Sequence, residues 1–300
     1  MGLLSNYIMV NLLFYSDPHG RVSRTRLAKY VKTYNIDAII CCGDVCDDRY
    51  IRPIAKRAAA QGVHWSNLVT DSQVLALRRK TMQSGKEVIQ VLASQKIPLY
   101  IIPGNWDISL NTDFASTYCK QQNVIVVDTE FAVHESFGIV GYGKVSHTEL
   151  QGDSPKSLKE YTQKYKQMEK AYEKLALKCG ADKPILLLSH NPPYNTQLDW
   201  VENSRSGKKR AHVGSLVIRR LVEQFSPSLV LCGHIHERKG TCKLRKTGCI
   251  NGGQAGVYVI SNTAMAVSKR SGSTSDSTKS SEDSLLHKKL GKWQISELKR

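Results

Sequence analysis

Five short polar turns, each directly after an apolar run, constrain the fold of this chain more than any other feature of its sequence. The first is SDPHG, in which Asp17 and His19 follow the apolar run of residues 8–16. The other four read CGDVCD, PGNWD, LSHNPP and CGHIHE, in that order along the chain. A solvated loop needs no such gathering of aspartate, histidine and asparagine. These residue types suit divalent metals such as Mn, Fe, Zn or Ni.

The apolar runs that precede these turns indicate an α/β fold. The segment IDAIICC is a short continuous apolar run, typical of a strand that is buried on both faces. Residues 21–35 place apolar side chains on one helical face, and residues 51–96 also read as helical. Strands that alternate with helices form α/β domains, whose functional groups collect at the loops after the strand C-termini. All five polar turns occupy such places.

A long helix is expected between two of the later strands. The stretch SPKSLKEYTQKYKQMEKAYEKLALKCG has Pro155 near its start and Gly180 at its end, as is typical of helix boundaries. We expect one face of this helix to join the core and its lysines to face water. The core stripe consists of Tyr161, Tyr165, Met168, Tyr172 and Leu175.

The sequence divides into one large domain and a different C-terminal part. Residues 1–267 are expected to form the domain, with a helical insert at about 153–180. Residues 268–286 are rich in serine and poor in apolar residues, which predicts a disordered linker or loop. Residues 287–300 form a basic segment that could supply a last strand.

Composition and charge narrow the classes of protein. Of the 300 residues 41% are hydrophobic, which is ample for a packed core. No apolar run reaches the roughly 18 residues of a membrane span. Cys41 and Cys42 are adjacent in an apolar run and the chain has no CxxC pair, so we expect free thiols and a reducing, cytoplasmic setting. The net charge of +17 attracts phosphate esters, nucleotides and nucleic acid.

In order along the chain, the five turns contain the motifs D-x-H, G-D-x-x-D, G-N-x-D, H and G-H-x-H. This ordered set resembles that of the calcineurin-like metallophosphoesterase superfamily, over residues 8–262. The run HVGSLVIRRLVEQFSPSLVLCGHIHE resembles its small phosphodiesterase-like branch. The resemblance implies an α/β fold, namely a four-layer α/β/β/α sandwich of two mixed sheets with outer helices. It also implies hydrolysis of phosphate esters, diesters above all, by a hydroxide that bridges two divalent metal ions. We expect Mn²⁺ first, with Fe, Zn or Ni as alternatives.

The same resemblance implies a role for each matched residue. Asp44 matches the carboxylate that bridges the two metals, and it forms the catalytic set together with Asn105 and His234. Asp47 and Asp107 match positions that orient the ligands. The matched metal ligands are Asp17, His19 and His236 for the first ion, Asn105, His190 and His234 for the second, and Asp44 for both.

One position departs from the family's pattern. The third motif usually reads G-N-H-D or G-N-H-E, and Trp106 takes the place of its histidine. Because an indole cannot act as a general acid at neutral pH, the chain must prefer good leaving groups or take the acid from elsewhere. We expect substrate contacts from Asn191, which follows a matched ligand, and from His212, which precedes a helix-opening turn.

Three interpretations stay open on the sequence alone. The first is a hydrolase of phosphate esters, with cyclic or small nucleotides, nucleic acid and phosphomonoesters all open as substrates. The second is a metal-binding interaction module of the same fold that lost useful turnover, as Trp106 would allow. The third is a nucleic-acid-binding protein whose binding depends steeply on salt and survives chelation. No specific protein partner is predicted.

Overall fold

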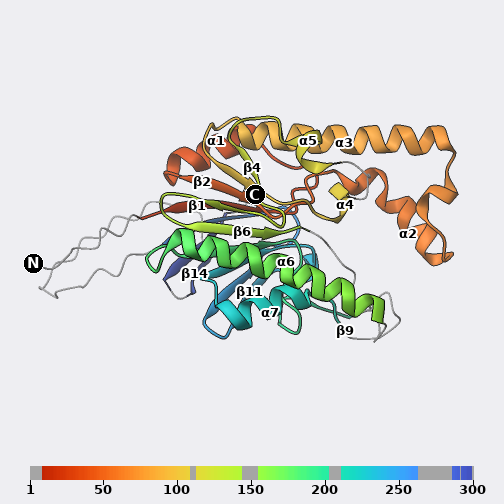
Figure 1. Ribbon diagram of the computed structural model, residues 1–300. Helices are drawn as coiled ribbons and strands as arrows, with labels where there is room; N and C mark the ends of the chain where they lie inside the picture. Colours follow the sequence, from red (N-terminus) through yellow and green to blue (C-terminus); the bar gives the residue numbers. More distant parts are fainter. Residues whose placement is uncertain are drawn as a thin grey trace, which may run out of the picture.

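The structure is a computed structural model that describes residues 9–108, 113–143, 155–202, 211–262, 286–290 and 292–298. Two mixed β-sheets pack face to face, and helices cover both outer faces (Figure 1). The four-layer α/β/β/α sandwich expected from the resemblance is therefore confirmed. Within the described helices, no stretch is long and apolar enough to cross a membrane.

The first sheet has, in the described part of the chain, seven strands in the order β14-β15-β13-β1-β2-β3-β4. Its four neighbours from β1 to β4 run parallel. They are β1 (Asn11–Ser16), β2 (Ala38–Cys41), β3 (Leu99–Ile101) and β4 (Val124–Val126).

The other three strands extend this sheet in antiparallel fashion. They are β13 (Gly256–Asn262), β14 (Leu286–Leu290) and β15 (Trp293–Glu297). Trp293 and Ile295 of β15 are buried between the two sheets, so the C-terminal segment contributes a strand to the core. The serine-rich stretch predicted to be disordered, residues 268–286, lies outside the described residues except for its last position.

The second sheet has six described strands in the order β11-β12-β10-β7-β6-β5. The six strands are β5 (Phe131–Val133), β6 (Gly138–Tyr142), β7 (Ile185–Ser189), β10 (Leu229–Cys232), β11 (Gly240–Leu244) and β12 (Thr247–Asn251). A separate antiparallel pair, β8 (Trp200–Val201) and β9 (Ala211–His212), stands beside it.

Alternation of side chains along β1 creates two cores at once. Leu12 and Phe14 point to the core between the sheets, whereas Leu13 and Tyr15 point to the outer core under the helices. The helices over this outer face are α1 (Arg24–Thr33), α3 (Asp71–Ala93) and α5 (Phe114–Tyr118).

The helical stretch expected at residues 51–96 is interrupted. It consists of α2 (Arg52–Ala60) and α3, separated by Gly62, which has a φ of +68°, and by the 3₁₀ turn η2 (Trp65–Leu68). The remaining short elements are η1 (Asp48–Tyr50), α4 (Asn105–Ile108) and η3 (His236–Arg238).

Helices α6 (Pro155–Cys179) and α7 (Leu216–Phe225) cover the second sheet. The stretch expected as a helical insert is α6, which connects the parallel neighbours β6 and β7. Its predicted core stripe is confirmed, since Met168, Tyr172 and Leu175 are buried and both tyrosines before them pack against the same core. The expectation of free thiols also holds for all eight cysteines, each of which lies in the described part of the chain.

Candidate metal centre

The five polar turns follow β1, β2, β3, β7 and β10, which are parallel neighbours within their own sheets. Their side chains meet, as the hydrogen bonds between turns demonstrate. The amide of His234 donates to Asp17 Oδ2 at 2.9 Å, and the amide of Trp106 donates to Asp44 Oδ1 at 2.9 Å. Residues more than 200 positions apart in the sequence therefore share one site.

Two glycines allow this convergence because no side chain would fit at their positions. A Cβ on Gly104 would lie 2.2 Å from Asp44 Oδ1, and a Cβ on Gly233 would lie 2.0 Å from Asp17 Oδ2. The glycines of the G-N and G-H turns thus let a neighbouring carboxylate touch the backbone.

The loop backbone is strained at four of the predicted ligands. Asp17, His19, Asp44 and His234 have φ values of 42°, 44°, 52° and 67°. This left-handed conformation costs roughly 1–2 kcal/mol for a residue with a side chain. Such strain gathers at functional sites, where the rest of the fold holds side chains in a required geometry.

One group of potential ligands consists of Asp17, His19 and His236, whose ligand atoms all lie within 4.8 Å of one another. His19 Nδ1 lies 3.3 Å from the carbonyl oxygen of Cys46, which can only accept, so its Nε2 carries the lone pair. That Nε2 lies 3.3 Å from Nε2 of His236. Asp17 Oδ1 is buried and receives no hydrogen bond in the described part of the chain. A cation would satisfy all three atoms.

A second group consists of Asp44, His190 and His234. His190 Nδ1 donates to the carbonyl of Cys42 at 2.8 Å, which leaves its Nε2 as an acceptor. The side-chain oxygen of Asn105 lies 3.0 Å from this Nε2 and 2.9 Å from Nδ1 of His234. The lone pairs of His190 Nε2 and of the Asn105 oxygen thus face each other, which again suits a cation.

Asp44 stands between the two groups. Its Oδ2 lies 3.7 Å from His19 Nε2 and 3.5 Å from His190 Nε2. Its Oδ1 is occupied by the amide of Trp106. The carboxylate is therefore held in place through one oxygen and presents the other to both groups.

Burial shapes the protonation of these side chains. It raises the pKa of Asp17 to about 7 and the pKa of Asp44 well above its usual range, with the charge of Asp107 adding to the effect on Asp44. Burial also lowers the pKa values of His19 and His236 to about 4 and of His190 to about 3. Neutral imidazoles are the form that binds metal, and crowded buried carboxylates favour a cation among them.

The two aspartates expected to orient the ligands differ in their contacts. Asp107 is fully buried and accepts hydrogen bonds from the amides of Gly104, Cys46 and Val45 at 2.9, 3.0 and 3.3 Å. It thereby ties the second turn to the third. Asp47 instead accepts its hydrogen bonds from the backbone and side chain of Arg49.

Sequence reasoning missed Asp48. This residue is buried, its Oδ1 lies 3.8 Å from His19 Nδ1, and its Oδ2 pairs with Arg52. The doubled aspartate in GDVCDD is the signal that could have found it.

The two expected substrate contacts lie on neighbouring segments. Asn191 follows His190 directly, is buried, and its side-chain oxygen receives no hydrogen bond in the described part of the chain. His212 is 37% exposed in β9, and its Nδ1 lies 2.8 Å from Asp199 Oδ1. Asp199 also escaped sequence reasoning, since nothing local marks it as a partner of His212.

The donor set of both groups fits divalent metal ions. It combines neutral imidazoles, carboxylates and an amide oxygen, which are ligands of Mn, Fe, Zn and Ni. The residue pattern thus agrees with the divalent metals that the resemblance implies, at the turns where the sequence predicts them.

Comparisons with known proteins identify the family of this chain. The family model described as "Calcineurin-like phosphoesterase" matches residues 10–238. The chain is 32% identical over 171 residues to the uncharacterized protein MJ1162 of Methanocaldococcus jannaschii, a match that covers 56% of this chain and 70% of that protein.

Two solved structures are similar to this chain. One crystal structure shares the fold, with a TM-score of 0.57 at 14% identity, covering 85% of this chain and 95% of its own. TT1561 of Thermus thermophilus gives a TM-score of 0.49 at 15% identity, with coverages of 83% and 94%. The family match supports metal-dependent hydrolysis of a phosphate ester. The chain belongs to the calcineurin-like phosphoesterase family.

Proposed function

We propose that this protein is a phosphodiesterase that uses two divalent metal ions, and that the preferred ion is Mn²⁺. The observation that carries the proposal is the position of Asp44 Oδ2, 3.5–3.7 Å from a ligand nitrogen of each group. A carboxylate shared in this way suits two ions better than one, because it offsets the charge of both.

In this proposal seven side chains hold the ions. Such ions would supply a water molecule of lowered pKa as the nucleophile and would neutralise the phosphoryl oxygens. Asp44 joins the two halves, and Asp107 keeps the surrounding loops in register. Asp17, His19 and His236 hold one ion, and Asn105, His190 and His234 hold the other.

Preference for diesters rests on Trp106 and on the charges around the site. A phosphomonoester dianion gains more than a diester monoanion from a cationic imidazole, which Trp106 does not supply. Arg21 and Arg52 lie near enough to His19 to lower its pKa, and they offer moderate attraction to a singly charged substrate. Nucleotide and nucleic-acid diesters fit the net charge of +17.

The test is hydrolysis of bis-p-nitrophenyl phosphate beside p-nitrophenyl phosphate by metal-stripped protein refilled with Mn²⁺, Ni²⁺ or Zn²⁺. We expect metal-restored turnover of the diester, and its loss in Asp44→Asn. Asp182→Asn is the matched control, because Asp182 is exposed in the turn after α6 and is not one of the candidate ligands. Preference for the monoester would refute the diester assignment.

A catalytically weak metal-binding module is the second candidate, and Trp106 is the observation in its favour. It predicts that metal analysis finds two ions per chain while neither ester is hydrolysed. A nucleic-acid-binding protein would instead bind oligonucleotides after chelation, with affinity that falls steeply as salt rises.

A further inference from the structure

Two cysteines that are not among the candidate metal ligands lie opposite each other on neighbouring strands of the second sheet. Cys242 of β11 and Cys249 of β12 are register partners in an antiparallel pair. All eight cysteines lie in the described part of the chain, and no other two of them are register partners. Both side chains pack in the outer core of the second sheet, so they stand on the same face.

This placement suits a disulfide bond. Residues directly opposite each other in antiparallel strands have Cα atoms roughly 4.5–5.5 Å apart. Disulfides join Cα atoms about 4.4–6.8 Å apart when the two side chains point to the same side. The two thiols are already in contact, because the thiol of Cys249 donates a hydrogen bond to the sulfur of Cys242. A bond between the two sulfur atoms therefore requires no change of register.

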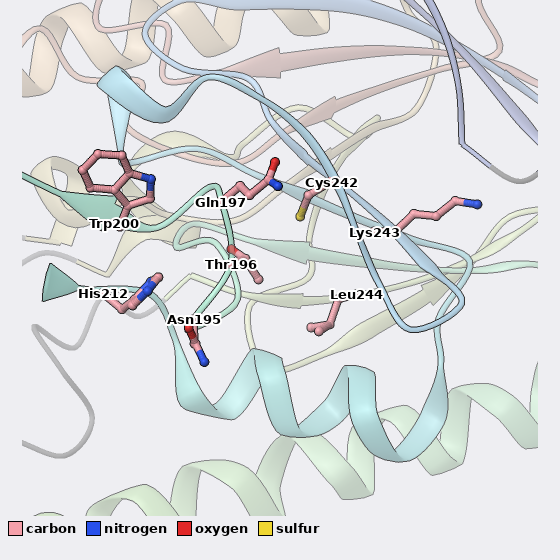
Figure 2. A pocket seen from close by; sticks show the side chains of 8 residues that line it. All are labelled: Asn195, Thr196, Gln197, Trp200, His212, Cys242, Lys243 and Leu244. Carbon is pink, nitrogen blue, oxygen red and sulfur yellow. The ribbon is translucent and has the colours of Figure 1, made fainter. Parts of the chain in front are cut away.

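The two thiols differ in acidity and in access. The hydrogen bond from Cys249 lowers the pKa of Cys242, and the same hydrogen bond together with burial raises the pKa of Cys249 well above its usual range. Cys249 is fully buried, whereas Cys242 is half-buried and lines a pocket of about 510 Å³. Figure 2 shows the Cys242 sulfur among the side chains around this pocket. A small oxidant thus meets the more acidic thiol first and finds a second thiol beside it.

Other cysteines lack this combination. Cys41 and Cys42 are adjacent in the sequence, but they belong to different cores and so point to opposite faces of the first sheet. Cys119 is half-buried like Cys242, but it lies outside the strands, and burial raises its pKa to about 12. Cys119 is therefore a suitable reference for the reactivity of a single cysteine in this protein.

We infer that Cys242 and Cys249 form a reversible disulfide when hydrogen peroxide oxidises the folded protein. The Cys242 thiolate attacks one peroxide oxygen, the O–O bond breaks, and the departing hydroxide takes up the proton that Cys242 released. Cys242 is then a sulfenic acid. The Cys249 sulfur attacks the Cys242 sulfur, the S–O bond breaks, and hydroxide leaves with the Cys249 proton as water. In total the two thiols lose two hydrogen atoms, and one peroxide is reduced to two water molecules.

The disulfide would fasten the edge of the sheet that carries the last ligand turn. Strand β11 is the edge strand, and its only neighbour in the described sheet is β12. Asn251, two residues after Cys249 on β12, donates to the carbonyl of Ile235, which lies between His234 and His236. The modified strand therefore also holds this turn. The inference does not depend on the proposed function.

The test is oxidation of the folded protein by hydrogen peroxide, followed by unfolding, alkylation of free thiols and mass spectrometry. We expect two of the eight cysteines to escape alkylation, a mass loss of about 2 Da, and a peptide in which Cys242 is joined to Cys249. Dithiothreitol should restore alkylation of all eight by thiol–disulfide exchange. Cys242→Ser and Cys249→Ala should each abolish the disulfide. Cys119→Ser, a change at a half-buried cysteine outside the pair, is the control and should leave it intact.

Three results would overturn the inference. They are alkylation of all eight cysteines after peroxide treatment, a disulfide between a different pair, and a sulfinic acid on Cys242 beside a free Cys249. Because Cys249→Ala removes a core side chain, its failure to fold would leave Cys242→Ser, at the half-buried position, to decide. A peroxide-dependent disulfide that persists in Cys242→Ser would contradict the inference, and its loss there would support it.

Discussion

One methyl group added at Gly104 would test whether close contact between loops builds the metal centre. The Cβ of Gly104→Ala would lie 2.2 Å from Asp44 Oδ1 and 2.4 Å from the Asp44 amide nitrogen. Ordinary contacts begin at 3.4 Å, so one turn must move by about 1 Å relative to the other. Functional geometries tolerate displacements of about 0.5 Å. Asp44 could then no longer serve both groups of ligands.

We expect Gly104→Ala to fold with a loss of about 1–3 kcal/mol, the usual cost of overpacking. The free energy of metal binding should weaken by far more than this loss in the free energy of unfolding. Calorimetric titration with Mn²⁺ measures the affinity, and thermal unfolding in chelator measures the stability. Activity on bis-p-nitrophenyl phosphate should fall together with the affinity.

Gly62→Ala is the matched control. Gly62 has a φ of +68°, but a Cβ there meets nothing within 4 Å. The substitution therefore costs roughly 1–2 kcal/mol of backbone strain without touching the centre. If Gly104→Ala binds metal as tightly as the Gly62→Ala protein, the reasoning about loop contact is wrong.

Three further predictions follow from the same site. Adding Mn²⁺ at 100 times its Kd to chelated protein should contribute about 2.7 kcal/mol for each ion bound and raise Tm by about 4 °C per ion in scanning calorimetry, since Asp17 and Asp44 gain a neutralising cation; an unchanged Tm would contradict a metal site there. Asp107→Asn should destabilise the fold by about 1–3 kcal/mol in urea unfolding and weaken metal binding, because the buried Asp107 carboxylate accepts hydrogen bonds from three backbone amides. An unchanged free energy of unfolding would show that these hydrogen bonds do not hold the loops. Trp106→His should raise the turnover of a dinucleoside phosphate, because an imidazole at this position can protonate the leaving oxygen and an indole cannot; an unchanged kcat would contradict the shortage of an acid there.

Much of the fold and the candidate ligands could be predicted because their signals are local. Each turn such as SDPHG directly follows its strand, so the residue pattern alone marks both the strand end and the candidate ligand. Parallel neighbours then bring these ends together within each sheet. The core stripe of α6 is visible for the same reason, since helical spacing places Met168, Tyr172 and Leu175 on one face.

Partners recruited by tertiary contact could not be predicted. Asp199 reaches His212 across a loop and a small strand pair, and no spacing rule connects the two. Asp48 and Asp47 are adjacent and chemically identical, and only the turn geometry of η1 directs one to His19 and the other to Arg49. The interruption of the helical stretch at Gly62 and η2 likewise depends on packing that local propensity does not record.

The most direct test of the account is a titration of Mn²⁺ into metal-stripped protein, with bound metal and hydrolysis of bis-p-nitrophenyl phosphate followed in the same samples. The account predicts that turnover rises until two ions are bound per chain, and that Asp44→Asn loses both the second ion and the turnover. Full turnover with one ion per chain, or without any added metal, would contradict it.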